Sequence, residues 1–464
     1  MPRASITESS AEPGSFRDRS SRVFYRNGAV LRGVSPQALK NWHALTKTTF
    51  FRRFSAEGRL VKTEAVEHSN EPMGSETGEW AGLLKHEPIP VVSYPYEWSF
   101  SMLKDAARLQ LDLLLAALDE DMTLKDASSF NIQWNGTRPV FIDIPSFEPY
   151  QPGHPWAGYR QFCQLFLYPL FLQAYKDVAF QPWLRGSIDG IAPEQFNGLL
   201  SWRDLLRPGV FAHVFLQSNA QRRYGATQVD VKSELRSAGF GKQLIIANVR
   251  RLRALVDRLH WRPNTSTWSN YYQDHGYSEE DHNLKKAFVA NAVQRARRRL
   301  VWDLGANTGV FSRIAAETSE YVVATDSDHA TIDRLYTSLR DDNQPRILPL
   351  VGNLADPSPR LGWRGLERKS LIDRGQPDLV LCLALIHHMV ITANIPLQEF
   401  VEWLADLGGD RATGVTHVRK RILGHERLGQ QCSQKRRGIP LIPVGGEMIS
   451  VQTITSQQED IRSR

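Results

Sequence analysis

The stretch 300–309 holds residue types that could bind a charged ligand at the end of a strand. It places Asp303 after an apolar run and follows it with Gly305 and Gly309. The apolar run predicts a buried strand, and the two glycines permit a sharp turn before a helix that begins near Val310. A carboxylate in this position can hold an ammonium group through a charge-assisted hydrogen bond. The turn lacks the G-x-G-x-x-G pattern that cradles a pyrophosphate, so a dinucleotide is disfavoured.

A second acid follows at a spacing suited to the sugar of the same ligand. The run 321–325 predicts another buried strand, and Asp326 ends it, seventeen residues after Gly309. An acid at the tip of the second strand of such a unit can accept hydrogen bonds from both ribose hydroxyls. The two acids therefore predict a nucleoside-containing ligand with a positively charged end.

Two further apolar runs predict that these residues lie on a parallel α/β sheet. The run 347–351 leads into Asn353 and Asp356, and the run 378–385 leads into a pair of histidines. Apolar strands that alternate with helical stretches are typical of a parallel sheet. Because ligands of such sheets bind beyond the carboxyl ends of the strands, we expect these polar residues to share one edge.

These motifs resemble those of the class I S-adenosylmethionine (SAM)-dependent methyltransferases, over residues 268–407. The resemblance implies a Rossmann-like domain with SAM as its cofactor. Upstream, the stretches 268–272 and 277–281, together with the turn 386–388, are similar to a family of rhizobial nodulation proteins and related bacterial methyltransferases. The cofactor ligands that the resemblance implies are Asp303, Gly305, Asn307, Gly309, Asp326, Asn353, Asp356 and Tyr271.

The histidine pair supplies the candidate catalytic residues. His387 or His388 could act as a general base on the methyl acceptor, whereas a histidine at a strand end can also be a hydrogen-bonded lining residue. Asn353 stands where the resembled family has an acid that contacts the adenine amino group, and an amide oxygen can accept the same hydrogen bond. Asp356 could also take over that role.

The expected acceptor is an oxygen or nitrogen atom of a small molecule, such as a saccharide or lipid-linked signal in host-specific nodulation. No carboxylate cluster for a metal-dependent mechanism can be identified, and no Asn/Asp-Pro-Pro-Tyr turn follows the fourth strand, which disfavours an exocyclic amine of a nucleobase. A catalytically impaired accessory protein and an RNA methyltransferase remain alternatives.

The N-terminal half carries a second group of polar residues. Asn131 follows Asp126 by five residues, and Asp143 ends the run 140–143. This spacing resembles the catalytic loop and metal-binding aspartate of protein kinases, with an edge strand at 60–64 and a helix at 99–118 upstream. No G-x-G-x-x-G loop is present and Lys125 replaces the usual arginine, so phosphotransfer is disfavoured. We expect an α+β accessory domain, with a divergent kinase-like fold as one interpretation, that binds or orients the methyl acceptor.

Composition is that of a two-domain protein of a reducing compartment. The chain has 464 residues, 41% of them hydrophobic, and 57 basic against 50 acidic residues give a net charge of +7, a mild excess that does not single out nucleic acid. Three scattered cysteines suit the cytoplasm. The longest apolar run, 162–175, is interrupted by Pro169 and predicts a core helix or an interfacial patch, so no transmembrane segment is expected. Oligomeric state is left open.

Changes in composition predict the domain boundaries. The segment 1–22 is polar and predicts a disordered leader, 23–224 an accessory domain, 225–267 a helical connector, and 268–407 the SAM-binding domain. A class I methyltransferase needs a fifth central strand after the helix at 397–407, but no apolar run follows. The segment 408–464 is therefore expected to be an atypical, poorly ordered tail with only two weak strands near its end, interrupted by Pro440 and Pro443.

Overall fold

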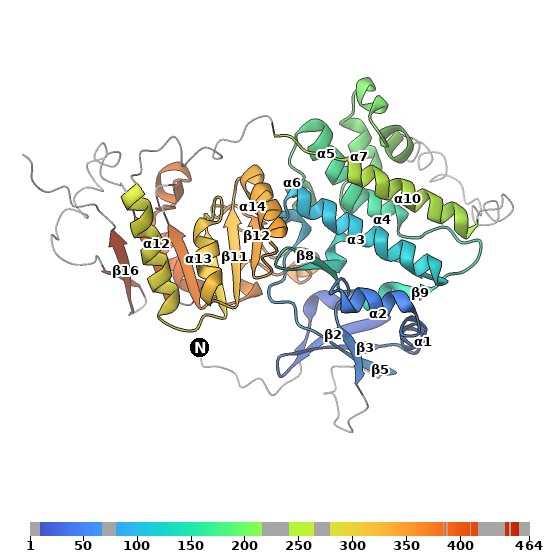
Figure 1. Ribbon diagram of the computed structural model, residues 1–464, viewed down its shortest axis with the longest axis horizontal. Coiled ribbons are helices and arrows are strands. Elements are labelled where there is room, and N and C mark those ends of the chain that lie inside the picture. The colour runs from blue at the N-terminus through green and yellow to red at the C-terminus, as the bar shows by residue number, and fades with distance from the viewer. Residues whose placement is uncertain are drawn as a thin grey trace, which may run out of the picture. The chain divides into compact units, whose positions relative to one another are not determined.

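The chain forms two compact units, each with its own sheet (Figure 1). The computed structural model describes residues 10–66, 80–215, 241–263, 279–383, 385–386, 388–408, 410–415, 441–444 and 447–453. The N-terminal unit comprises Met1–Asn264 and Arg360–Arg368, and the C-terminal unit comprises Thr265–Pro359 and Lys369–Arg464. Residues 360–368, which we call the strap, thus belong to the N-terminal unit although they lie between strands of the other.

The N-terminal unit opens with a five-stranded antiparallel sheet in the order β1-β2-β3-β5-β4. Its strands are β1 (Ser10–Ala11), β2 (Ser21–Arg26), β3 (Ala29–Val34), β4 (Thr63–Val66) and β5 (Gly82–His86). The predicted strand at 60–64 begins slightly later, as edge strand β4. The prediction of a disordered leader over 1–22 is wrong for residues 10–22, because β1 pairs with β2 and a 3-10 turn at Pro13–Ser15 follows it. Backbone pairing orders this polar segment without an apolar run.

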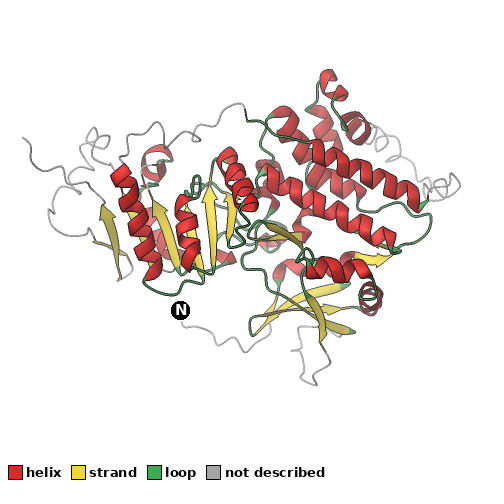
Figure 2. Cartoon of the chain, in the orientation of Figure 1, coloured by secondary structure: helices red, strands yellow, loops and turns green. Residues whose placement is uncertain are grey.

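Helices make up most of the rest of this unit (Figure 2). The predicted helix at 99–118 is confirmed as α3 (Phe100–Asp119), which begins after the N-cap Ser99 and is buried along most of its length. The apolar run 162–175 is confirmed as core, since it forms a π-helical turn and α5 with nearly every side chain buried. Up to residue 215 the α- and π-helical segments are α1 (Pro36–Leu45), α2 (Thr49–Ala56), α3, α4 (Tyr159–Phe162), the π turns Cys163–Leu167 and Phe211–Phe215, α5 (Tyr168–Lys176), α6 (Gln181–Gly186) and α7 (Pro193–Gly198).

Four short strands follow α3 and form two small sheets. Strand β6 (Met122–Leu124) pairs with β9 (Phe147–Pro149), and β7 (Ile132–Asn135) forms a hairpin with β8 (Arg138–Phe141). The loops between them carry the polar residues of the predicted kinase-like motif.

The predicted helical connector is part of the N-terminal unit. Helix α10 (Lys242–Arg258) packs along α3 and buries an apolar face that includes Val249 and Leu252. Lys104 of α3 donates to the backbone oxygens of Asp257 and Leu259 at 3.0 and 2.7 Å. The interpretation as a connector is therefore wrong for 242–258, because an amphipathic helix is stabilised most by burying its apolar face.

The C-terminal unit is built on a seven-stranded sheet in the order β12-β11-β10-β13-β14-β16-β15. The four predicted apolar strands are confirmed as β10 (Leu300–Leu304), β11 (Tyr321–Asp326), β12 (Ile347–Val351) and β13 (Leu379–Leu383), all parallel. Helices α12 (Glu279–Gln294), α13 (Val310–Thr318) and α14 (His329–Asp341) share one apolar core with these strands, and α15 (Leu397–Asp406) precedes the last part of the sheet. The strand order reverses between β10 and β13, and ligands of such sheets bind at the carboxyl ends of the strands at this point.

The expectation of a missing fifth strand is wrong. Strand β14 (Asp410–Val415) pairs in parallel with β13 on one side and with β16 (Glu447–Thr453) on the other, and β15 (Leu441–Val444) closes the sheet antiparallel to β16. Two ladders of backbone hydrogen bonds outweigh the weak strand propensity of Asp410 and Gly414. Pro443 lies in the edge strand, where a missing N–H is tolerated. The other residues of the predicted poorly ordered tail lie outside the described part.

Two features of the described residues limit other interpretations. Among the described residues, no helix is both long enough and apolar enough to cross a bilayer. Arg298, in the basic run 295–299, is buried and donates to the backbone oxygens of Ala292 and Asp378. Arg298 therefore has a structural role, because a positive charge is favourable near the C-terminus of the preceding helix.

Candidate functional site at the carboxyl edge of the parallel sheet

The turn after β10 has the glycine-dependent geometry that the sequence predicts. Gly305 and Gly309 have φ of 76° and 77°, values that side chains with a Cβ rarely adopt. The amides of Gly305 and Ala306 both donate to the Thr325 oxygen, at 2.8 and 3.0 Å. A Cβ on Gly305 would lie 2.7 Å from Leu385 Cδ2. The turn is thus held against the end of β11, and α13 begins directly after Gly309.

Asp303 is buried beneath this turn rather than displayed on it. Its carboxylate is 1% exposed and accepts a hydrogen bond of 2.6 Å from Ser312 Oγ in the first turns of α13. Burial, with the nearby charge of Asp326, raises the pKa of Asp303 to about 6. In this position Asp303 fixes the end of β10 to α13, and its predicted contact with a ligand ammonium stays a prediction.

Asp326 lies at the end of β11 and is less buried than Asp303. Its Oδ2 accepts from the Asn307 amide at 2.9 Å and its Oδ1 from the Asp328 amide at 3.0 Å. Each carboxylate oxygen is therefore fixed in place and keeps a lone pair for another donor. Burial raises the pKa of Asp326, while these backbone bonds oppose the rise. The turn after β10 and the acid of β11 thus meet at the same edge.

The remaining predicted residues are distributed around that edge. Asn353 and Asp356 are exposed in one turn after β12, where Asn353 Oδ1 accepts from the Ala355 amide at 3.0 Å. The amide of Gly352, the residue before Asn353, donates to the backbone oxygen of Asp326 at 2.8 Å. His388, after β13, is half-buried; burial lowers its pKa and the charge of Asp326 opposes this. Tyr271 and His387 lie outside the described residues.

The sequence analysis did not anticipate Ser312, whereas Asn307 is one of the predicted cofactor ligands. Ser312 bonds Asp303, and a lone hydroxyl residue among the apolar positions of α13 could have indicated it. Asn307, with φ of 49°, has a buried side-chain oxygen for which no hydrogen-bond partner is found in the described part of the chain. A buried acceptor without a donor is unfavourable, so this oxygen is available to accept a hydrogen bond.

The kinase-like motif of the N-terminal unit also comes together. Asn131 Nδ2 donates to Asp143 Oδ2 at 3.5 Å, and Ser146 Oγ donates to the same oxygen. Burial raises the pKa of Asp126, and the charge of Asp143 adds to the rise. Among the described residues, no three His, Cys, Asp or Glu side chains are grouped so as to hold a metal ion. The kinase-like interpretation stays a prediction.

The basic residue at this motif is Arg32, which the sequence analysis missed. Arg32 lies in the middle of β3, is buried, and forms an ion pair with Asp143 through Nη1 at 2.5 Å. Lys62, in the middle of the strand predicted at 60–64, is exposed and pairs with Glu87 at 3.7 Å. A charged residue in the apolar centre of a short strand was the available indication.

The sheet order, the glycine turn after β10 and the acid that ends β11 define the Rossmann-like fold of class I methyltransferases for the C-terminal unit. No protein-family model matches the chain. It is 34% identical over 397 residues to the nodulation protein NoeA of Rhizobium meliloti strain 1021, an alignment that spans 85% of this chain and 82% of that protein. The chain therefore belongs to the NoeA family.

Solved structures resemble parts of the chain. A SAM-dependent methyltransferase from Aquifex aeolicus is 12% identical, with 28% of this chain and 62% of that one aligned and a TM-score of 0.21. The YcgJ protein from Bacillus subtilis is 11% identical, with 30% and 53% aligned and a TM-score of 0.23. The chain thus spans less than two thirds of these two proteins. At such scores the likeness is local, and the strand order carries the fold assignment.

Proposed function

We propose that the C-terminal unit binds SAM at the carboxyl edge of β10, β11 and β12 and transfers its methyl group to an acceptor. One observation carries this proposal: the backbone amide of Asn307 donates to Asp326 Oδ2 at 2.9 Å, and the buried side-chain oxygen of the same Asn307 has no partner among the described residues. A nucleoside with two hydroxyl donors and an ammonium end supplies the donors that these acceptors lack.

The residues divide into ligands and positioning groups. Asp326 would accept hydrogen bonds from the ribose hydroxyls, and the exposed turn of Asn353 and Asp356 would receive the adenine amino group. Asp303 would position the glycine turn through Ser312 instead of touching the ligand. These acceptors fit the polar groups of SAM, whose positively charged sulfonium supplies an electrophilic methyl group when it is bound.

The chain's part in the chemistry is to orient the acceptor and remove its proton. Burial lowers the pKa of His388, so a larger share of its imidazole is neutral near pH 7 and can accept a proton from an acceptor hydroxyl or ammonium group. Holding two reactants in line contributes most of the rate in a substitution of this kind. The relative is named as a nodulation protein, and we propose as acceptor a small molecule, such as a saccharide or lipid-linked signal.

Calorimetric titration of the full chain with SAM tests the proposal. We expect micromolar binding that weakens by about 10- to 100-fold in Asp326→Asn, because an NH₂ group replaces one acceptor oxygen and the remaining oxygen loses its charge. Asp341→Asn, an exposed acid at the end of α14, should leave binding unchanged. Absence of SAM binding by the unchanged protein would refute the proposal.

Methyl transfer itself is tested with labelled SAM and two acceptor pools, small-molecule extract and total RNA. Label in the small-molecule pool supports the proposed acceptor class. Label in RNA, with binding that falls steeply with salt, would replace it by RNA methylation. Binding of SAM without label in either pool would favour an impaired accessory protein.

A further inference from the structure

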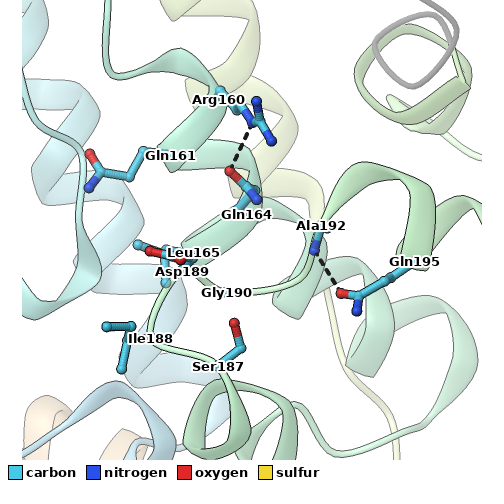
Figure 3. Close-up of a pocket in the computed structure, with 10 residues that line it drawn as sticks. All are labelled: Arg160, Gln161, Gln164, Leu165, Ser187, Ile188, Asp189, Gly190, Ala192 and Gln195. Atoms are coloured by element: carbon cyan, nitrogen blue, oxygen red, sulfur yellow. Dashed lines mark hydrogen bonds between the residues drawn. The ribbon is translucent and has the colours of Figure 1, made fainter. Parts of the chain in front are cut away.

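The helical part of the N-terminal unit contains a cavity of about 510 Å³ (Figure 3). This volume lies within the range of small-ligand sites, about 300 to 1,000 Å³. The walls come from α4, the π-helical turn Cys163–Leu167, the loop 187–192 and α7. None of these elements belongs to the proposed SAM site, so the cavity is a separate feature of the molecule.

The cavity wall depends on an unusual backbone. Gln164 lies in the π-helical turn, and its backbone oxygen accepts a hydrogen bond of 3.0 Å from the Ile191 amide of the facing loop. Gly190 has φ of 80°, and a Cβ there would lie 2.3 Å from that same Gln164 oxygen. Only glycine fits this approach of loop to helix. π-helical turns of this kind occur often at functional sites, where they re-aim side chains.

Three glutamine amides in the wall have their oxygens already occupied. Gln161 Oε1 accepts from the Ala127 amide at 2.7 Å. Gln164 Oε1 accepts from Arg160 Nε at 3.2 Å, and Gln195 Oε1 accepts from the Ala192 amide at 3.2 Å, as the dashed lines in Figure 3 mark. No bond from their NH₂ groups is found within the described ranges. Each glutamine therefore retains two N–H donors for a ligand.

The charges of the wall balance. Arg160 supplies one positive and Asp189 one negative charge, and Ser187 adds a hydroxyl. An anionic ligand would meet the carboxylate of Asp189, and a cationic ligand would meet the guanidinium of Arg160. A neutral ligand avoids both repulsions. The cavity is thus rich in N–H donors, has one carboxylate acceptor and carries no net charge.

A hydroxyl group matches this set because it accepts and donates at once. It can accept from a glutamine NH₂ while donating to the Asp189 carboxylate. Leu165 and Ile188 add apolar wall against which the C–H face of a sugar ring can pack. We propose that this cavity binds a neutral polyhydroxylated ligand of mono- or disaccharide size. The inference goes beyond the proposed function, because it predicts binding in the other unit and requires no methyl transfer.

Saturation-transfer NMR and calorimetry of the full chain test this proposal with named probes. The neutral probes are glucose, N-acetylglucosamine, maltose and cellobiose, and the charged comparators are glucuronate and glucosamine. We expect at least one neutral probe to bind with a dissociation constant below about 1 mM, and more tightly than either comparator. Failure of every neutral probe, or tighter binding of a charged one, would overturn the proposal.

Conservative variants locate the binding. Gln195→Glu keeps the oxygen that accepts from the Ala192 amide but removes the N–H donors, and Asp189→Asn removes the charged acceptor without changing the shape. Each should weaken binding of the neutral probe by about tenfold or more. Asp119→Asn, an exposed acid at the end of α3, is the matched control and should bind like the unchanged protein. Equal binding by all variants would place the ligand elsewhere and overturn the assignment. SAM binding should stay unchanged in each, so this test and that of the proposed function fail independently.

Discussion

Asp303, near the end of β10, and Asp326, at the end of β11, are both aspartates but have different surroundings. Asp303 is sealed in the core with one hydroxyl partner, whereas Asp326 is held by two backbone amides at the edge of the sheet. Sequence spacing placed both acids near strand ends and predicted ligand contact for both, and that contact stays a prediction. The difference depends on Ser312, which approaches Asp303 only after α13 has packed on the sheet.

The burial of Asp303 predicts a specific pH dependence of stability. Its pKa is about 6 in the folded protein and lower in the unfolded chain, so between these values the folded state binds the proton more tightly. The free energy of unfolding should therefore fall as pH rises through this window, by up to about 3 kcal/mol, and stay low above about pH 6. Asp303→Asn, which carries no charge, should lack this contribution. Urea unfolding of both proteins from about pH 4 to pH 7 measures it, and parallel curves would contradict the prediction.

Gly309 offers a test of the turn with a matched control. Gly309→Ala places a Cβ at φ of 77° and 2.5 Å from Leu335 Cδ1 in the core, whereas Gly28→Ala has φ of 78° and open space within 4 Å. We expect a loss of about 2–4 kcal/mol for the first and about 1 kcal/mol for the second, from backbone strain alone. Denaturant unfolding measures both. Equal losses would show that Leu335 does not constrain the turn.

At the scale of elements, the sequence pattern predicted those strands whose formation depends on burial of their own apolar residues. Strands β10 to β13 are continuous apolar runs because helices cover them, and their limits agree with the sequence expectation within a residue or two. Strand β14 was not predictable, because its hydrogen bonds come from β13 and β16, distant in sequence, and not from its own side chains. Helix α10 was predicted as a helix, but the periodicity of its apolar residues does not show that it packs on α3. The same holds for the cluster of Arg32 with Asp143.

The strap is an element whose place no local pattern could indicate. Glu367, 3% exposed, accepts from Arg17 Nε and Nη2 at 2.9 and 2.7 Å, and the Arg368 guanidinium lies 3.9 Å from the centre of the Phe130 ring. We expect Glu367→Gln to destabilise the N-terminal unit by about 1–2 kcal/mol, since a bidentate charged pair is lost at a site open to water on the arginine side.

An exposed pair provides the comparison for the strap. Glu320→Gln breaks a 2.6 Å pair with Arg297, in which the two side chains are 48% and 86% exposed. This change should cost less than about 0.5 kcal/mol. Thermal unfolding of the two variants measures the difference, and a similar small effect of both would mean that the strap contributes little to the unit that it joins.

At the scale of the molecule, the chain joins two units that each have a sheet and a core. The strap makes the C-terminal unit discontinuous, since β12 and β13 flank nine residues that belong to the other unit. The proposed SAM site uses residues of the C-terminal unit alone, and the proposed saccharide cavity uses residues of the N-terminal unit alone. Each ligand should therefore stabilise chiefly the unit that contains its site, because a ligand stabilises the folded state that binds it.

Hydrogen exchange measured by mass spectrometry tests this division. SAM at about 100 times its dissociation constant should add about 2.7 kcal/mol of protection to peptides from β10, β11 and β12, and little to peptides from α3. A neutral sugar should do the reverse, with protection around 160–167 and 187–195. Asp326→Asn should abolish the first pattern and leave the second. Equal protection of both units by SAM would mean that its site is not confined to the C-terminal unit, and the assignment of the cofactor edge would then have to include residues of the N-terminal unit.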